Sequence, residues 1–175
     1  IEKACLMIMF SILAILGTYF GRPVEDAYAN TRAVGVIVAG LIGGLSVGTG
    51  TGIIAGIHRF LLGGFTSYSS AISTILEGML SGLYYYRIRH KRERWLMAGV
   101  ATFILECLRM LILLLMSKPF EQAFKLVETI GPPMVIINPL GVAVFIALLE
   151  NLYHEHEKIQ GKAARLTMQI ANQTL

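Results

Sequence analysis

The sequence predicts an all-α integral membrane domain, and three observations support this prediction. Hydrophobic residues make up 55% of the 175 residues and charged residues 15%, whereas soluble domains contain about 25% charged residues. The charges are clustered, and several apolar stretches remain between the clusters. Their lengths are close to the roughly 20 apolar residues that a helix needs to cross a bilayer. Five glycines fall within residues 43–52 of an uncharged stretch, so we expect two helices there rather than one.

About six transmembrane helices are expected. A first span at 4–20 and a polar loop at 21–26 precede a short helical hairpin, which runs from about Tyr28 to Gly44, turns tightly, and returns to about Leu62. Three further spans complete the domain, with Gly131-Pro132-Pro133 opening the last of them. Their expected bounds are 68–86, 95–116 and 131–152, with connections at 63–67, 87–94 and 117–129.

The chain divides into a membrane domain at 1–152 and a polar helical tail at 153–175. Five of the fifteen basic residues lie between Arg87 and Arg94, and short loops rich in Lys and Arg face the cytoplasm. Two crossings later the tail is cytoplasmic as well, and the loop at 63–67 faces outside. The basic cluster is therefore interpreted as a topology signal of a multi-pass membrane protein. It does not indicate a nucleic-acid partner.

Ionisable residues within spans are expensive to bury and usually have a role. Glu106 and Arg109 are three residues apart, which places them on one helix face as a structural ion pair. Glu77 is expected to face a polar bundle interior, also in a structural role.

Arg32 and Arg59 differ, because neither has a carboxylate within four residues in the sequence. One interpretation is that they extend to the lipid headgroups. The other is an anion site, because guanidinium groups bind carboxylates bidentately. A hairpin places both arginines near the outer face, beside Ser70 and Ser73, whereas one unbroken helix separates them by about 40 Å.

No pattern in the chain indicates catalysis, a cofactor or a metal. The four histidines lack a ligand spacing, the glycines lack the Lys-Ser/Thr pair of a phosphate loop, and no nucleophile stands in a recognisable arrangement with a base. Cys5 and Cys107 lie in apolar stretches and are interpreted as inert packing groups.

The segments around the two arginines resemble the membrane sensor domain of LytS-type bacterial sensor histidine kinases, the LytS/BtsS pyruvate-sensing family. The resemblance covers nearly the whole chain, and the segment at 163–175 is similar to the connector that leads to cytoplasmic GAF-type and kinase domains. The main matching motifs are Asn30-Thr31-Arg32, Gly56-Ile57-His58-Arg59, Gly63-Gly64-Phe65-Thr66 and Ile72 to Gly78.

This resemblance implies a multi-pass receptor of the bacterial inner membrane that binds extracellular pyruvate and signals to a LytTR-type response regulator. It further implies a homodimer with a histidine kinase domain beyond this chain. It implies that Arg32, Arg59 and Ser73 bind the ligand. Ser70 stands where the pyruvate-sensing relatives have Cys. Asn30 and Thr66, from the same motifs, complete the expected ligand-binding set. The fold is expected to be similar to the substrate-binding components of vitamin transporters.

Two functions are considered. The first is the input domain of a two-component sensor kinase that passes its signal through the last helix. The alternative is a transporter or capture component for a small anion, which would have no need of the polar helical tail.

Overall fold

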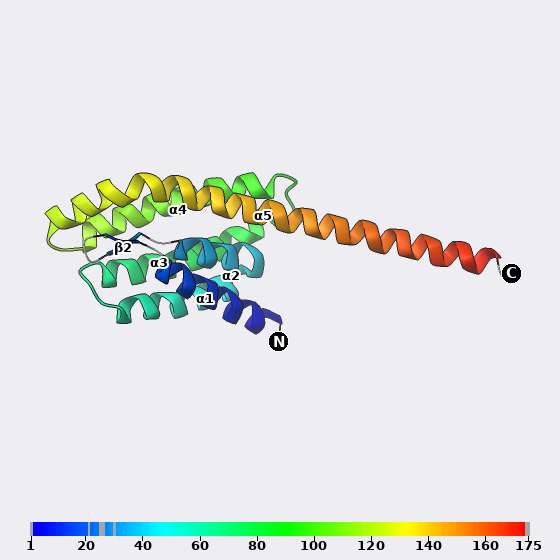
Figure 1. Cartoon of the computed structure of the whole chain (residues 1–175), viewed down its shortest axis with the longest axis horizontal. Helices are drawn as coiled ribbons and strands as arrows, with labels where there is room; N and C mark the ends of the chain where they lie inside the picture. Colours follow the sequence, from blue (N-terminus) through cyan, green and yellow to red (C-terminus); the bar gives the residue numbers. More distant parts are fainter. Residues whose placement is uncertain (1, 21, 25–26, 30, 174–175) are drawn as a thin grey trace.

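The computed structural model describes residues 2–20, 22–24, 27–29 and 31–173. Within these residues the chain forms a helical bundle and one short β-ribbon, and the last helix extends far beyond the bundle (Figure 1). The elements are α1 (Glu2–Tyr19), β1 (Arg22–Val24), β2 (Ala27–Ala29), α2 (Arg32–Leu61), α3 (Ser67–Ile88), α4 (Arg94–Met116) and α5 (Phe120–Gln173).

Four of the described helices, α1, α2, α4 and α5, are long and apolar enough to cross a membrane. This finding supports the prediction of a helical integral membrane domain. Large apolar side chains are exposed along these helices, as on a surface that faces lipid, among them Ile104, Leu115, Leu140 and Leu148.

Helix α2 is broken at Gly44, as the glycine-rich sequence predicts. Gly44 has φ 76° and ψ −166°, a conformation that is essentially restricted to glycine. The break divides α2 into a first arm at 32–43 and a second arm at 45–61. At Gly48 the two arms approach so closely that a Cβ atom would overlap the Cα of Gly40.

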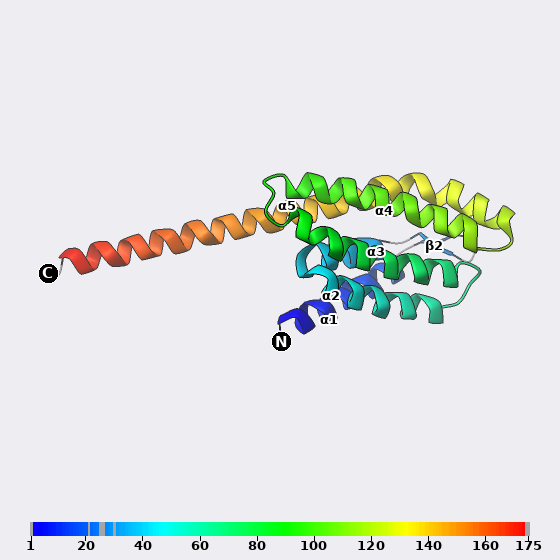
Figure 2. The same cartoon turned by 180° about the vertical axis from the view of Figure 1, so that it is seen from behind.

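Both arms pack on α3, and they run along it in opposite directions. Gly40 of the first arm lies against Ser81 and Gly82, whereas Gly52 of the second arm lies against Thr74 and Ile75. Figure 2 shows α3 alongside the hairpin from behind. The two ends of α2 therefore return to the same end of the bundle.

The segment before α2 differs from the prediction. β1 and β2 pair in antiparallel fashion, with Pro23 opposite Tyr28, and α2 begins only at Arg32. The expected helix start near Tyr28 is therefore wrong. Val24 and Tyr28 favour strands, and Pro23 cannot donate within a helix.

The start of α5 also differs from the prediction. The expected connection at 117–129 is mostly helical, and Pro132 and Pro133 lie inside α5 instead of opening it. Ala123, Leu126 and Ile130 are buried, and this spacing is that of an amphipathic helix. The helix therefore begins a full three turns earlier than the proline pair suggests.

The two ends of the bundle carry different segments. The basic connection between α3 and α4 lies at the same end as the start of α1 and the point where α5 leaves the bundle (Figure 1). The β-ribbon and the connection between α4 and α5 lie at the opposite end. This arrangement agrees with the expected topology, and the orientation in the membrane stays a prediction.

We expect Gly44→Ala to lower the stability of the domain by about 1–3 kcal/mol, because a Cβ is strained at this backbone conformation. The measurement is thermal unfolding in detergent micelles. Gly161→Ala is the control, because Gly161 is helical and a Cβ there meets nothing within 4 Å. Equal melting temperatures of the Gly44 variant and the parent would contradict the strained turn.

We expect a cysteine at position 91 to react only from the cytoplasmic side, and a cysteine at position 118 only from outside. Lys91 and Lys118 are exposed at opposite ends of the bundle, and basic loops remain inside. The measurement is labelling of intact cells with an impermeant thiol reagent, in a background without Cys5 and Cys107. Labelling of position 91 from outside would reverse the topology.

Candidate functional site

A polar stripe runs along the buried face of α3. Apart from the adjacent Ser73 and Thr74, its residues recur every three or four positions, as on one face of a helix, and each is at most 5% exposed. Glu77 belongs to this stripe, so it faces the bundle interior as the sequence predicts. The members of the stripe are Thr66, Ser70, Ser73, Thr74, Glu77 and Ser81.

Arg59, near the end of the second arm of α2, reaches the beginning of this stripe. Its Nη1 donates to the carbonyl oxygen of Gly63 at 2.7 Å, and its Nη2 donates to Oγ1 of Thr66 at 2.9 Å. Arg59 is only 1% exposed. Its guanidinium group therefore points into the bundle rather than along the membrane surface.

Arg32, the first residue of α2, reaches the same stripe from the other arm. Its Nε donates to Oγ1 of Thr74 at 3.2 Å, and this hydroxyl donates to the carbonyl oxygen of Ser70 at 2.7 Å. Arg32 is also 1% exposed. The hairpin thus brings one arginine to Thr66 and the other to Thr74, about two turns apart along α3.

The predicted serines lie between these two anchor points on α3. Ser70 and Ser73 are both buried, and the Ser73 hydroxyl donates to the carbonyl oxygen of Ser70 at 3.0 Å. Thr66 binds Arg59 directly. Asn30 lies outside the described residues. The structure thus gathers the described members of the predicted set along two turns of α3.

A second buried cluster lies deeper along the stripe. Nη1 of Arg109 is 3.6 Å from Oε1 of Glu106, which confirms the predicted pair, and Nε of Arg109 is 4.0 Å from Oε1 of Glu77. Asn138 of α5 donates to Oε1 of Glu106 at 2.6 Å. The cluster therefore connects α3, α4 and α5.

Sequence reasoning assigned no role to Asn138. The sequence does contain one indication of its role: Asn138 is a single amide in an otherwise apolar stretch of α5. A polar group inside a membrane needs a hydrogen-bond partner. Its partner on α4 is 32 residues away in the sequence, so helical spacing could not identify it.

The structure contains a cavity of about 330 Å³ between α1, α2 and α5, near both clusters. Thr31, next to Arg32, and Asn138 both contribute to its wall. A second cavity, of about 280 Å³, lies at the opposite end of the bundle. Arg32 and Arg59 line neither of the two.

Comparison with known proteins identifies the family. A family model described as 5TMR of 5TMR-LYT matches residues 1–152. The chain belongs to this family. It is 39% identical to the sensor histidine kinase BtsS of Escherichia coli K12 and 37% identical to the sensor protein LytS of Bacillus subtilis 168, in each case over 99% of this chain. The sensor histidine kinase YpdA of E. coli K12 is 32% identical over the same share.

These relatives are longer, and this chain spans about a third of their length, 32% for both BtsS and LytS. No solved structure shows a significant match. The predicted resemblance is confirmed: the chain is a multi-pass membrane input domain of the LytS/BtsS type of bacterial sensor histidine kinase, which implies two-component signalling. The comparisons give no support to the transporter alternative.

We expect Glu106→Gln to destabilise the domain more than it affects ligand binding. Removing one partner of a buried ion pair costs about 3–5 kcal/mol, and Glu106 contacts Arg109 and Asn138. The measurement is thermal unfolding in micelles, with exposed Glu121→Gln as the control. A variant with full stability that no longer binds ligand would make Glu106 a ligand residue.

Proposed function

We propose that this input domain senses a small carboxylate, pyruvate in the first place, at the outer end of the bundle. The observation that carries the proposal is the convergence of two arginines from opposite arms of α2 on the first turns of α3. A guanidinium pair is a natural receptor for a carboxylate, because it offers charged donors in a planar arrangement.

The hydrogen bonds of Arg32 to Thr74, and of Arg59 to Gly63 and Thr66, hold both guanidinium groups against the beginning of α3. A carboxylate that reached this place would accept two parallel N–H bonds from one guanidinium group. Two buried arginines at one end of the bundle favour an anionic ligand over a neutral or cationic one.

Hydroxyl groups would recognise the remaining oxygen of the ligand. In the proposed complex the carboxylate lies between Arg32 and Arg59, and Thr66, Ser70 and Ser73 donate to the carbonyl oxygen. Asn30 completes the proposed set. The selection of pyruvate among small monoanions rests on the resemblance to the pyruvate-sensing family, because the arrangement of donors suits any short 2-oxo acid.

Binding at this place would require movement. Both arginines are 1% exposed, so a ligand enters only if the arms of α2 shift relative to α3. A ligand shifts a conformational equilibrium by its difference in affinity for the two states. The carboxylate contacts to the two arginines are the proposed source of that difference in affinity.

The signal would leave through α5, which extends from the bundle as one helix to Gln173. We further propose that the arms of α2 act as separate crossings, giving six membrane helices in an arrangement like that of vitamin-transporter binding components. In the whole protein we propose a homodimer whose histidine kinase domain signals to a LytTR-type response regulator.

We expect Arg32→Ala and Arg59→Ala each to weaken pyruvate binding at least tenfold, because hydrogen bonds to charged groups contribute about 1.5–3 kcal/mol each. Lysine at either position should weaken binding less than alanine, because charge is retained and the planar fork is lost. The measurement is calorimetric titration of the purified chain with pyruvate, lactate and acetate. Arg87→Ala, in the exposed basic segment, is the control.

Ser70→Cys should be tolerated, because a thiol replaces a hydroxyl of similar size, and the resemblance to the pyruvate-sensing family implies Cys at this position. Unchanged pyruvate affinity in both arginine variants would exclude this site. A loss in only one variant would mean that the arginines do not share a ligand.

A further inference from the structure

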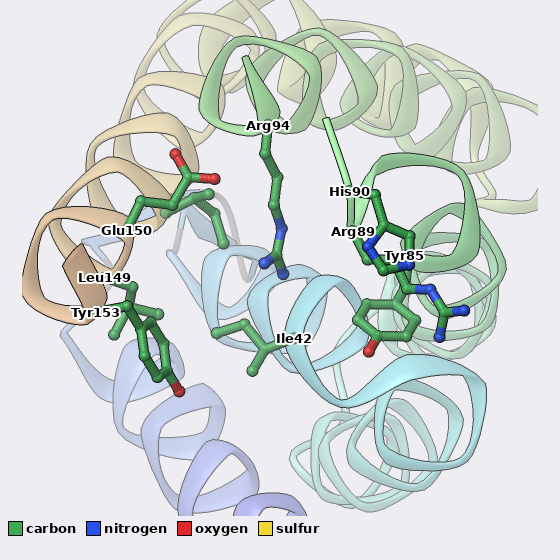
Figure 3. Close-up of a pocket in the computed structure, with 9 residues that line it drawn as sticks. Ile42, Tyr85, Arg89, His90, Arg94, Leu149, Glu150 and Tyr153 are labelled. Carbon is green, nitrogen blue, oxygen red and sulfur yellow. The ribbon is translucent and has the colours of Figure 1, made fainter. Parts of the chain in front are cut away.

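A second cavity lies at the end of the bundle that carries the basic segment, and the proposed carboxylate site does not involve it. Its volume is about 280 Å³, and it lies between the bend of α2, the end of α3, the start of α4 and α5 (Figure 3). Its wall is formed by Ile42, Tyr85, Arg89, His90, Arg94, Ile146, Leu149, Glu150 and Tyr153.

The cavity has an apolar interior and a polar rim. Ile146 is 1% exposed, and Ile42 and Leu149 are partly buried, whereas Arg89, His90 and Tyr153 are exposed. This combination of an apolar floor with a cationic and aromatic edge is the chemistry of the boundary between hydrocarbon and headgroups. The position agrees, because α5 leaves the membrane domain beside it.

Arg94 reaches furthest toward the bend of α2. In Figure 3 its side chain extends from the start of α4 toward the hairpin, and its Nη2 donates to the carbonyl oxygen of Leu41 at 2.5 Å. This carbonyl belongs to the last turn before Gly44, where helical partners are missing. The Nε–H of Arg94 is buried and has no hydrogen-bond partner among the described residues.

The remaining charges leave the cavity positive. The guanidinium group of Arg89 lies 5.9 Å from the ring centres of both Tyr85 and Tyr86, which holds it near the rim. Glu150 lies on the α5 side (Figure 3). Two arginines against one carboxylate give a formal charge of +1 with His90 neutral, and an anion is therefore favoured.

We propose that this cavity binds the phosphate group of an anionic phospholipid. Arg89 and Arg94 would donate to the phosphate oxygens, because Arg binds phosphate in the same bidentate manner as carboxylate. An acyl chain would lie along Ile42 and Leu149. The apolar floor favours a lipid over a free phosphate, which gains nothing from burial beside aliphatic side chains.

The bound lipid would contact three helices and the bend of α2 at once. Ile146 through Tyr153 belong to the stretch of α5 that leads out of the bundle. A phosphate held by Arg89 and Arg94 would fix this stretch relative to α3 and α4. Membrane composition would thus set the resting position of the helix that leaves the domain.

The test compares phosphatidylglycerol, phosphatidylcholine and inorganic phosphate, each titrated into the full chain in detergent micelles. Thermal unfolding gives the apparent affinity, and native mass spectrometry counts bound lipids. We expect phosphatidylglycerol to raise the melting temperature in a saturable manner with one tightly bound lipid. Phosphatidylcholine and inorganic phosphate should have little effect at the same concentration.

Arg89→Gln and Arg94→Gln should each weaken phosphatidylglycerol binding at least about tenfold, as expected for a lost hydrogen bond to a charged group. Arg87→Gln and Arg92→Gln are matched controls, because they remove the same charge from the same segment without lining the cavity. In these control variants the loss of general attraction to anionic lipid should weaken phosphatidylglycerol binding by no more than about fivefold. Arg94 also contacts the bend of α2, so Arg94→Gln could prevent folding. In that case the lipid affinity of Arg89→Gln alone tests the proposal.

Equal losses in the cavity variants and the control variants would overturn the proposal, because they would indicate diffuse attraction only. Saturable stabilisation by inorganic phosphate at the same concentration would show that the cavity binds a soluble phosphate. The assignment to a lipid would then be wrong. Absence of any effect of phosphatidylglycerol would exclude the site. None of these outcomes bears on pyruvate binding at Arg32 and Arg59.

Discussion

The reversal of the backbone at Gly44 is the constraint on which the rest of the domain depends. Continued as one helix, α2 would place Arg32 and Arg59 about 40 Å apart. Because Gly44 adopts φ 76°, the second arm returns along the first, and the close approach at Gly48 keeps the arms together. Both arginines then reach the same face of α3. The conformation of one residue therefore decides whether a shared anion site can exist.

Buried charge explains the polar face of α3, which is not among the described helices that are apolar enough to count as membrane-crossing candidates. Moving an ion out of water costs several kcal/mol unless it acquires partners, and in a membrane water is not available as a substitute. The stripe on α3 supplies these partners: hydroxyl groups for Arg32 and Arg59, and Glu77 for Arg109. The same stripe lowers the hydropathy of α3, so four other helices, and not α3, stand out as apolar membrane-crossing candidates. Its polarity thus reflects its central position between the hairpin and α4.

Patterns among residues that are close in the sequence predict some parts of this structure correctly and other parts wrongly. Glycine density located the break in α2, and helical spacing identified the Glu106–Arg109 pair, because both depend on neighbours in the chain. The proline pair predicts the start of α5 too late, because Ala123, Leu126 and Ile130 already follow a helical period before it. The sequence does not predict the role of Asn138, because its hydrogen-bond partner Glu106 lies on another helix. The break predicts that Arg32 and Arg59 return to the same end of the bundle, whereas their hydroxyl partners depend on the packing of α3 against both arms.

The two buried clusters share α3, and this gives the proposed sensor a physical connection to its output. Thr74, which binds Arg32, lies one turn from Glu77 on the same face. Arg109 stands between two carboxylates at 3.6 and 4.0 Å, so a small shift of α3 relative to α4 changes which carboxylate it favours. Glu106 in turn holds Asn138 of α5, next to Pro139, whose missing N–H weakens the helix locally. In the proposed complex, a ligand that drew Arg32 away from Thr74 would perturb the face of α3 from which polar contacts lead to α5. Coupling between the ligand site and α5 requires polar contacts that have two arrangements of similar energy. Arg109, which is shared between Glu77 and Glu106, meets this requirement better than a single tight ion pair would.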